Sequence, residues 1–306
     1  MLLEGVIPAN ILPLDTDLEI DEAAYRKHLA WLTSIPGVRG ITCNGHAAEV
    51  ASLARDERRR ALAIAVDTVA GSVPVVSGVY AENHRDAAVL ARDAQAEGAD
   101  ALLIFPPNLL AYDAPPDTAY RHFAEIAEAV PLPLVAFVYP EWSGLQYDTD
   151  TLMRICEIPS VAAVKEWSLD IRVHERNCRA VRSLGRPVSL LTSFSTNLLP
   201  ALAGGVDGIL SGHGSVIAEL QAKLFDAVAG DRLEEARRLY EPIQRLTAVI
   251  YRSPMANMYA RMKEHLIMLG HQLSPAVRPP LVPVDETERR ELRSALVDAG
   301  LLAENG

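Results

Sequence analysis

Cysteine is scarce in this chain, and long apolar stretches are absent from it. Cys43, Cys156 and Cys178 are too few and too scattered for a disulfide framework or a zinc site, so we expect reduced thiols in a cytoplasmic protein. No apolar run reaches the roughly 18 residues that a membrane helix needs, and the N-terminus lacks the basic and apolar regions of a signal peptide. We therefore expect neither a membrane segment nor a secretory leader.

Excess positive charge is also missing. The 306 residues include 29 Lys and Arg against 40 Asp and Glu, a net charge of −11, whereas nucleic-acid-binding domains usually present a basic face. We therefore expect no nucleic-acid partner. A small anionic substrate stays open, because a local pocket can oppose the overall sign. Hydrophobic residues make up 49% of the chain, enough for a core of normal size.

Lysine is rare, and one of the four lysines stands out by its position. Lys27, Lys223 and Lys263 lie in polar, helix-like surroundings, whereas Lys165 ends the apolar run V-A-A-V at 161–164. A cation at the end of a buried strand is costly unless it is paired, solvated or used. In a β/α barrel the catalytic residues lie at the carboxyl ends of the strands. A lysine there that apolar walls keep neutral is a candidate Schiff-base nucleophile.

Short apolar runs alternate eight times with longer amphipathic ones. Runs that are continuously apolar or β-branched are typical of parallel strands buried on both faces. The expected strands are 5–12, 38–43, 73–79, 101–105, 134–139, 161–165, 188–192 and 208–211. Eight β-then-α cycles predict an α/β fold, the (β/α)8 TIM barrel. A doubly wound open sheet would instead favour an early G-x-G-x-x-G turn, which the chain lacks.

The pattern becomes purely helical after residue 229. Helices are expected over 232–251, 254–269 and 286–299, with a proline-rich connector at 275–283 between the last two. We therefore predict a barrel over 1–229 that carries the catalytic site, followed by a C-terminal helical extension over 230–306.

Six short motifs stand in one order along the chain. They are G-V-I-P-A at 5–9, G-H-A-A-E at 45–49, F-V-Y-P at 137–140, V-K-E at 164–166, D-G-I-L-S at 207–211 and R-P-P-L at 278–281. In this order and spacing the chain resembles the dihydrodipicolinate synthase and N-acetylneuraminate lyase family of Schiff-base aldolases. The resemblance implies a TIM barrel and an imine formed by Lys165. It also implies a homo-oligomer, a tetramer or a dimer.

The chain departs from this family where protons are handled. Phe137 stands where the family has a tyrosine that relays protons near the imine. Residues two apart in a strand face the same side, so the hydroxyl of Tyr139 could enter the same pocket. A tyrosine packed beneath a loop is an equally good interpretation.

The carboxylate-binding loop also differs. His46 and Ala47 replace the family's hydroxyl pair, so His46 is a candidate proton carrier, and the backbone from Gly45 to Ala47 is a candidate cradle for a carboxylate. Trp142 stands near the family's arginine for the second substrate, which argues against the dihydrodipicolinate synthase reaction itself.

Further side chains can be assigned on the same basis. Phe137 and Trp142 are expected to wall the pocket, and Leu210 lies in the eighth strand motif beside it. His213 suits either a pocket group or a surface loop. Glu166 should face the helices, since its neighbour Lys165 faces inward.

The expected function is a Schiff-base-forming lyase that cleaves or forms an aldol bond of a pyruvate-type 2-oxo acid, with neither metal nor organic cofactor. Lowering the lysine pKa to 7–8 disfavours the charged amine by about 3–5 kcal/mol, and burial beside Val161 and Ala163 acts in that direction. The same imine could serve a dehydratase or a deaminase. Two other classes stay open: a keto-acid binder without catalysis, and a metal-dependent barrel hydrolase using His46, Glu49 and His213.

Overall fold

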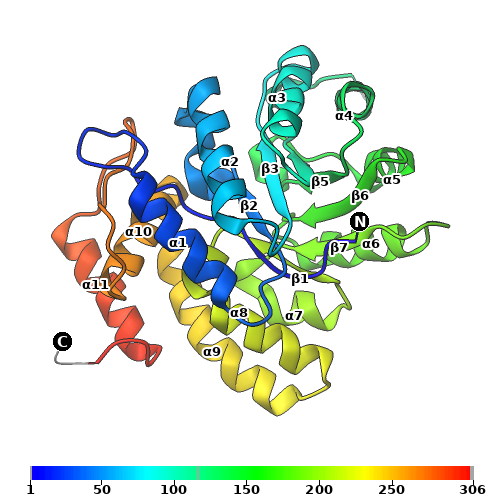
Figure 1. Cartoon of the computed structure of the whole chain (residues 1–306). Coiled ribbons are helices and arrows are strands. Elements are labelled where there is room, and N and C mark those ends of the chain that lie inside the picture. Colours follow the sequence, from blue (N-terminus) through cyan, green and yellow to red (C-terminus); the bar gives the residue numbers. More distant parts are fainter. Residues whose placement is uncertain (1, 116, 304–306) are drawn as a thin grey trace.

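In residues 2–115 and 117–303, which the computed structural model describes, eight parallel strands form a ring enclosed by helices (Figure 1). The strands are β1 (Gly5–Pro8), β2 (Ile41–Cys43), β3 (Val75–Val79), β4 (Ala101–Ile104), β5 (Leu134–Val138), β6 (Val161–Glu166), β7 (Ser189–Thr192) and β8 (Gly208–Ser211). From β2 to β8 each strand pairs with the next, and β8 pairs with β1. The isolated bridges Val6–Val38 and Ala9–Thr42 join β1 to the β2 segment. The expected TIM barrel is confirmed.

Helices follow the strands in strict alternation. Around the barrel they are α1 (Glu22–Ser34), α2 (Arg55–Val69), α3 (His84–Ala96), α4 (Thr118–Ala129), α5 (Thr149–Glu157), α6 (Ile171–Arg182), α7 (Leu198–Ala203) and α8 (Gly214–Ala229). The extension contributes α9 (Leu233–Ile250), α10 (Met258–Met268) and α11 (Glu286–Asp298). Short 3₁₀ turns lie at several strand ends: η1 (His46–Ala48), η2 (Val50–Ser52), η3 (Asn108–Tyr112), η4 (Glu141–Ser143), η5 (Ser195–Asn197) and η6 (Met255–Asn257).

Two strands have only half the length that the sequence predicts. The first was expected over 5–12, but β1 ends at Pro8 because its partner β8 ends at Ser211. The second was expected over 38–43, but β3 begins opposite Ile41, so Val38 has only its bridge to β1. Residues 1, 116 and 304–306, which fall within the predicted barrel and extension, lie outside the described part of the chain.

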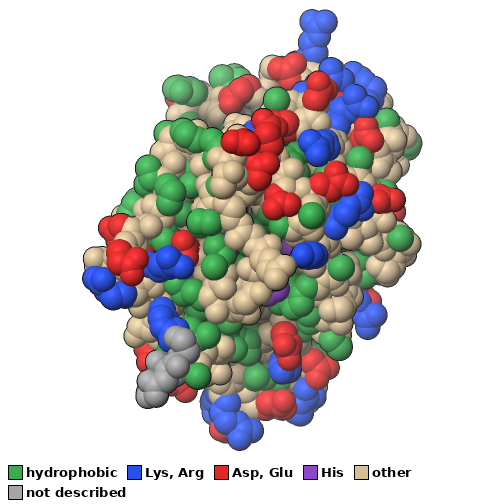
Figure 2. Space-filling model, turned by 60° about the vertical axis from the view of Figure 1, so that its left-hand side comes forward, with side chains coloured by type: hydrophobic (Ala, Val, Ile, Leu, Met, Phe, Trp, Pro, Cys, Tyr) green, Lys and Arg blue, Asp and Glu red, His purple; other side chains and the backbone are tan. Residues whose placement is uncertain are grey.

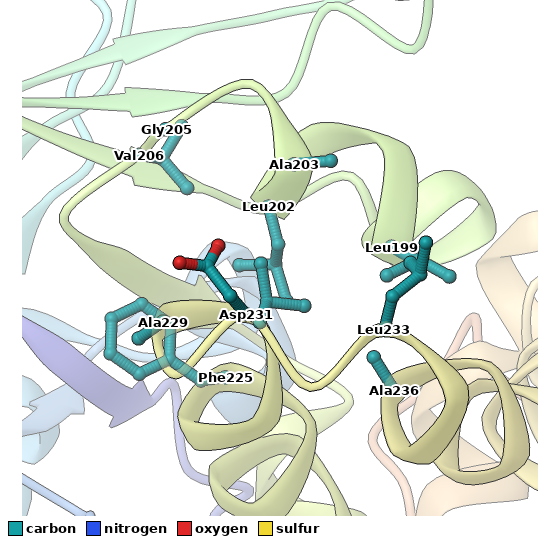
Figure 3. Close-up of a pocket in the computed structure, with 11 residues that line it drawn as sticks. Leu199, Leu202, Ala203, Gly205, Val206, Phe225, Ala229, Asp231, Leu233 and Ala236 are labelled. Carbon is teal, nitrogen blue, oxygen red and sulfur yellow. The ribbon is translucent and has the colours of Figure 1, made fainter.

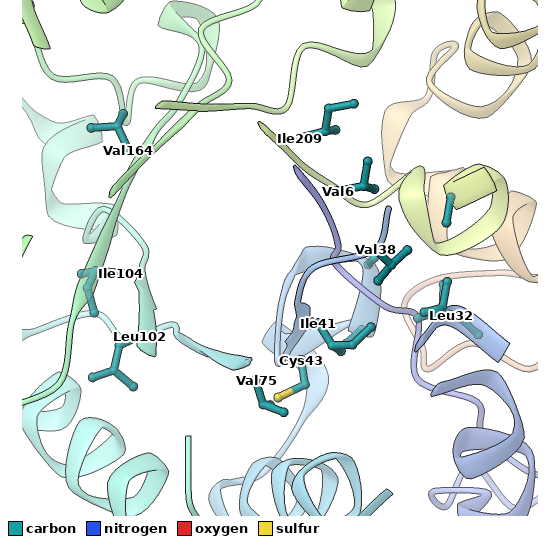
Figure 4. Close-up of a cluster of buried hydrophobic side chains, with 14 of the residues drawn as sticks. Val6, Leu32, Val38, Ile41, Cys43, Val75, Leu102, Ile104, Val164 and Ile209 are labelled. Carbon is teal, nitrogen blue, oxygen red and sulfur yellow. The ribbon is translucent and has the colours of Figure 1, made fainter. Parts of the chain in front are cut away.

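The strands separate two apolar layers. Along β4, Leu102 and Ile104 face the helices, whereas Ala101, Leu103 and Phe105 face the barrel interior. This alternation follows from the two-residue repeat of a strand. Figure 4 shows outward-facing residues of several strands, which pack against the surrounding helices. The inner layer fills the barrel with apolar side chains that range in size from alanine to phenylalanine and tyrosine, so the barrel is a packed core rather than a pore.

The β6 strand breaks the alternation near its start. The register between β5 and β6 shifts after the Leu134–Val161 pair, so that Val135 pairs with Ala163. Val161 therefore packs in the outer layer, and the expectation that it shares a face with Lys165 is wrong. Ala163 does lie in the inner layer, on the same side as Lys165.

The C-terminal extension packs on the barrel. Helix α9 packs along α8, and α10 contacts α8 and the turn η1 (Figure 1). A buried ion pair joins the parts: Lys263 of α10 donates to Glu49 after η1 at 2.6 Å, and Glu49 also accepts the backbone N–H of Arg278 at 2.9 Å. Outer-layer residues from both parts form one continuous core, and the division at 229/230 stays a prediction.

The surface carries charges of both signs. On the face shown in Figure 2, acidic and basic side chains alternate with apolar ones, without a broad basic area. No helix in the described part of the chain combines the length and the apolar character needed to cross a membrane.

Candidate active site

A cavity of about 30 Å³ lies at the carboxyl ends of the strands, and Lys165 lines it. Four expected site residues form part of its wall: His46, Ala47, Phe137 and Lys165. The wall also includes residues that the sequence did not single out: Trp167, Ser193, Gly212, Tyr251, Met258 and Met262.

Lys165 is a buried amine without a counter-charge. Its side chain is 4% exposed, and no hydrogen bond or ion pair reaches its Nζ from the residues that the structure describes. Burial lowers the pKa of Lys165 from 10.5 to about 7. The Phe137 ring centroid lies 3.9 Å from Nζ and works in the opposite direction, because the face of an aromatic ring attracts a cation. A large fraction of the amine is therefore neutral near neutral pH, as a nucleophile requires.

Beside this amine, His46 and Tyr139 form a hydrogen-bonded pair. Nε2 of His46 bonds to the Tyr139 hydroxyl, although the two residues come from different strand ends. Burial and the nearby charge of Lys165 lower the pKa of His46 to about 3, so the imidazole is neutral. Burial raises the pKa of Tyr139 well above 10, so the phenol keeps its proton. Tyr139 is therefore the donor in this bond and His46 the acceptor.

Aromatic rings surround the pair. The ring centroid of His46 lies 5.0 Å from that of Phe105 and 6.0 Å from that of Phe137. The Phe137 and Tyr139 centroids are 4.5 Å apart, and Trp167 packs against both. These rings exclude water from one side of the lysine, which strengthens electrostatic interactions there and favours the neutral amine.

The loop after β2 has two residues in the left-handed region. Asn44 has φ 52° and Glu49 has φ 55°, a conformation that costs non-glycine residues about 1 kcal/mol each. Side chains hold both ends: Asn44 donates to the Arg58 carbonyl at 3.0 Å, and Glu49 binds Lys263. Glu49 is thus a structural residue that ties this loop to α10. Between them, the backbone N–H groups of His46 and Ala47 make no backbone hydrogen bond within the described residues, so they can donate to a ligand oxygen.

The extension supplies three of the pocket residues. Tyr251 follows α9, and Met258 and Met262 lie on α10. Burial raises the pKa of Tyr251 to about 12, although its hydroxyl bonds to Ser195 and Ser211 at the barrel mouth. Motifs at strand ends cannot reveal residues from so distant a segment. Trp167 had a signal, since it lies two residues after Lys165 on the same strand face.

Five expected residues are not part of the cavity wall: Tyr139 and Gly45 adjoin His46, and three others lie further away. Leu210 is buried in the inner layer beneath the pocket. His213 is fully buried and bonds through Nδ1 to Thr247 of α9 at 3.1 Å, so it is neither a pocket residue nor a surface residue. Trp142 in η4 is 66% exposed and meets the pocket only through its edge contact with Trp167, 6.4 Å between centroids.

The three side chains that a metal-dependent hydrolase would use do not meet. His46 bonds to Tyr139, Glu49 to Lys263 and His213 to Thr247. Within the described residues, no three His, Cys, Asp or Glu side chains converge as ligands of one ion. The geometry therefore gives this alternative no support.

A larger hollow lies elsewhere on the barrel. A groove of about 520 Å³ lies between α7, α8 and α9. Figure 3 shows Leu199, Leu202, Phe225 and Leu233 among its apolar residues. Asp231 is the one ionisable side chain among its lining residues, and it would repel a carboxylate. This groove is much larger than the cavity at Lys165, but a 2-oxo acid needs the amine at the strand ends.

Similarity to known proteins agrees with this geometry. A model of the dihydrodipicolinate synthetase family matches residues 2–299. The chain belongs to this family. It is 33% identical over 309 residues to 4-hydroxy-tetrahydrodipicolinate synthase of Methanopyrus kandleri, covering 99% of each chain. It is 30% identical to an uncharacterised DapA-like lyase of Halobacterium salinarum, covering 98% of this chain and 95% of that one. The crystal structure of a dihydrodipicolinate synthase from Bacillus anthracis superposes with a TM-score of 0.88 at 27% identity, covering 97% and 99%.

Family membership confirms the resemblance seen in the motifs. It also confirms that the chain is a Schiff-base-forming lyase that acts on a 2-oxo acid. The replaced residues at the strand ends make it a divergent member of the dihydrodipicolinate synthetase family.

Proposed function

We propose that Lys165 is the imine-forming residue and that the enzyme cleaves or forms a C–C bond next to the imine of a pyruvate-type 2-oxo acid. One observation carries this assignment: a buried lysine at a strand end, with its pKa lowered to about 7 by burial and no counter-ion among the described residues. The neutral amine attacks the keto carbon, and loss of water gives the imine. The protonated imine withdraws electrons, so the bond between the next two carbons can break or form through an enamine.

The His46–Tyr139 pair is the proposed proton relay. Tyr139 holds a proton at neutral pH and His46 can accept one, so together they can protonate the leaving hydroxyl and take a proton from the adjacent carbon. This pair takes over the role of the tyrosine that Phe137 replaces. A keto-acid binder without catalysis would have no need for it.

The substrate carboxylate is assigned to the loop after β2. The free backbone N–H groups of His46 and Ala47 supply two donors on one side of the pocket, and the Ser193 hydroxyl supplies a third at the end of β7. Phe137 serves as a wall below the amine, as expected from the sequence. Gly45 starts the turn, and Trp142 is assigned to the outer mouth rather than to the wall.

The second substrate is proposed to carry no charge. Apart from Lys165 and the neutral His46, the one ionisable side chain of the pocket wall is Tyr251, and it keeps its proton below pH 10. Trp167, Met258 and Met262 are apolar. A charged aldehyde would lose its hydration there without a partner. We therefore expect 4-hydroxy-2-oxo acids with an apolar substituent to be cleaved faster than those with a second carboxylate.

Borohydride trapping tests the imine. Incubation with pyruvate and borohydride should give a stable adduct that peptide mapping places on Lys165 and that Lys165→Met lacks. Lys263 is an internal control, since it is equally buried but paired with Glu49. An adduct elsewhere, or none with any 2-oxo acid, would refute the assignment. Product analysis with the 4-hydroxy acids then separates aldol cleavage from dehydration, and an amino substrate that releases ammonia would indicate a deaminase.

We also propose that the enzyme works in the cytoplasm as a homo-oligomer, a tetramer or a dimer. All three cysteines are free and buried, as suits a reducing compartment. Leu109, Tyr112 and Trp142 are exposed in the turns after β4 and β5, where a second copy could cover them. Light scattering coupled to size exclusion measures the assembly directly, and a monomer at micromolar concentration would contradict it.

A further inference from the structure

On the outer face of β6, opposite Lys165, three chemically active side chains meet. Glu166 points towards the helices, as expected, and its Oε2 lies 2.8 Å from Nδ1 of His174 on α6. Nε2 of His174 in turn lies 3.6 Å from Sγ of Cys178. His174 and Cys178 are four residues apart, which places both on one face of the helix. The result is a thiol, an imidazole and a carboxylate in line.

The carboxylate is fixed from several directions. Its Oε1 accepts hydrogen bonds from the Ser168 backbone N–H and from the Asn177 side chain, both at 3.3 Å. Because Oε2 binds Nδ1, Nδ1 carries a proton and Nε2 is turned towards the thiol. Burial lowers the pKa of His174, but its bonds to Cys178 and Glu166 outweigh burial and raise the pKa to about 10. The imidazole can therefore hold the thiol proton at neutral pH.

This cluster opens to a groove between α6 and α7. The groove has a volume of about 560 Å³, and His174 and Cys178 are among its lining residues. Its charged residues are Glu175, Arg179 and Arg182, all on α6, with Arg182 paired to Asp207 at 2.8 Å. The residues that α7 and its end contribute, Pro200, Ala203 and Gly204, are uncharged. Small molecules can reach the thiol from this side.

The other two cysteines provide a contrast within the same chain. Cys43 and Cys156 are fully buried, and burial raises the pKa of each thiol to about 12. Cys178 is 7% exposed, lines an open groove and has an imidazole partner. Reactive cysteines have this combination of partial exposure and a cationic neighbour, whereas structural ones lack it.

We propose that Cys178 is a nucleophilic thiol, activated by His174 and Glu166, that forms a mixed disulfide with small disulfides entering the α6–α7 groove. His174 Nε2 takes the thiol proton, and the thiolate attacks one sulfur of the incoming disulfide. The new bond joins Sγ to that sulfur, the original S–S bond breaks, and the other half leaves as a thiolate that takes up a proton. The incoming disulfide is the oxidant, and a small thiol reverses the reaction.

The test follows the reaction of the native assembly with 5,5′-dithiobis(2-nitrobenzoate) at pH 6, where the released thiolate is coloured. An ordinary cysteine thiol is only about 0.3% ionised at pH 6. Because the His174 imidazole stands beside the sulfur and can take its proton, we expect Cys178 to react about tenfold faster than glutathione. The rate should change little between pH 6 and 8.

Variants and mapping decide the assignment. One equivalent should react, peptide mapping should place it on Cys178, and Cys178→Ser should abolish it while Cys156→Ser leaves it unchanged. His174→Gln should slow the reaction at pH 6 at least tenfold, with circular dichroism checking that the variant is folded. The pH profile of the wild type tests the proposal without any variant. A rate that rises tenfold per pH unit up to pH 8, or native protein whose thiols react only after unfolding in urea, would overturn it.

Discussion

Replacement of Lys165 by methionine should make the protein more stable, most strongly at low pH. Burial lowers the pKa of Lys165 from 10.5 to about 7, and each pKa unit corresponds to about 1.4 kcal/mol. The buried amine therefore costs the folded state about 5 kcal/mol at pH 6. The face of Phe137 offsets about 1–2 kcal/mol of this. Methionine has a side chain of similar length and carries no charge, so we expect a gain of about 3–4 kcal/mol at pH 6.

The gain should shrink as the pH rises. The folded-state pKa of this amine is lower than the unfolded one, so the unfolded chain binds one more proton between pH 7 and 10.5. The destabilisation is complete below pH 7 and disappears as the pH approaches 10.5. At pH 9.5 the calculated difference between variant and wild type falls to about 1 kcal/mol.

Urea unfolding followed by circular dichroism at pH 6 and pH 9.5 measures this difference. Protein concentrations are matched, because subunit association adds to the apparent stability. Lys223→Met is the control, since Lys223 is more than half exposed beside Glu219 and should change the free energy of unfolding by less than about 0.5 kcal/mol at either pH. A Lys165→Met gain that is equal at the two pH values, or a loss at pH 6, would refute the idea that burial keeps this amine neutral.

Three further outcomes follow from the site. The rate of imine formation with pyruvate should rise with pH up to about 7 and then level off, because the neutral amine is the nucleophile. Rapid-quench trapping across pH 5–9 measures this rate, and a rate that does not change with pH would count against the assignment. Tyr139→Phe should lower kcat by about 10²–10⁴ while borohydride still traps the imine, and an unchanged kcat would remove the relay. Lys263→Met should lower the free energy of unfolding in urea by about 3–5 kcal/mol, because it leaves Glu49 buried without its ion pair. Adding Glu49→Gln to this variant should recover part of the loss. A Lys263→Met variant as stable as the wild type would contradict this expectation.

The sequence predicted the barrel and the lysine because both depend on local patterns. Continuous apolar runs mark strands buried on two faces, and a cation at the end of such a run is visible without any structure. The spacing of Tyr139 from Phe137 left its hydroxyl free either to enter the pocket or to pack beneath a loop, by a rule that holds within a regular strand. In the structure this hydroxyl bonds to His46. The same rule failed for Val161, because a register shift between β5 and β6 lies between it and Lys165.

The rest of the wall depends on contacts between distant segments. Tyr251 and Met262 belong to the extension, and only the packing of α9 and α10 on the barrel brings them to Lys165. His213 looked like a strand-end group in sequence, but α9 covers it through Thr247. Trp142 follows a site motif and still points outward, whereas Trp167 takes the wall position.

Because three pocket residues lie in the last fifth of the chain, the order of synthesis matters. A ribosome that has released the eight strands has already exposed Lys165, but the segment with Tyr251, Met258 and Met262 is still to come. Chains form structure from the N-terminal end as they emerge. The nascent barrel therefore carries its amine without the apolar wall that completes the pocket, and α10 also brings Lys263 to the buried carboxylate of Glu49. Completion of the reactive pocket thus coincides with completion of the polypeptide.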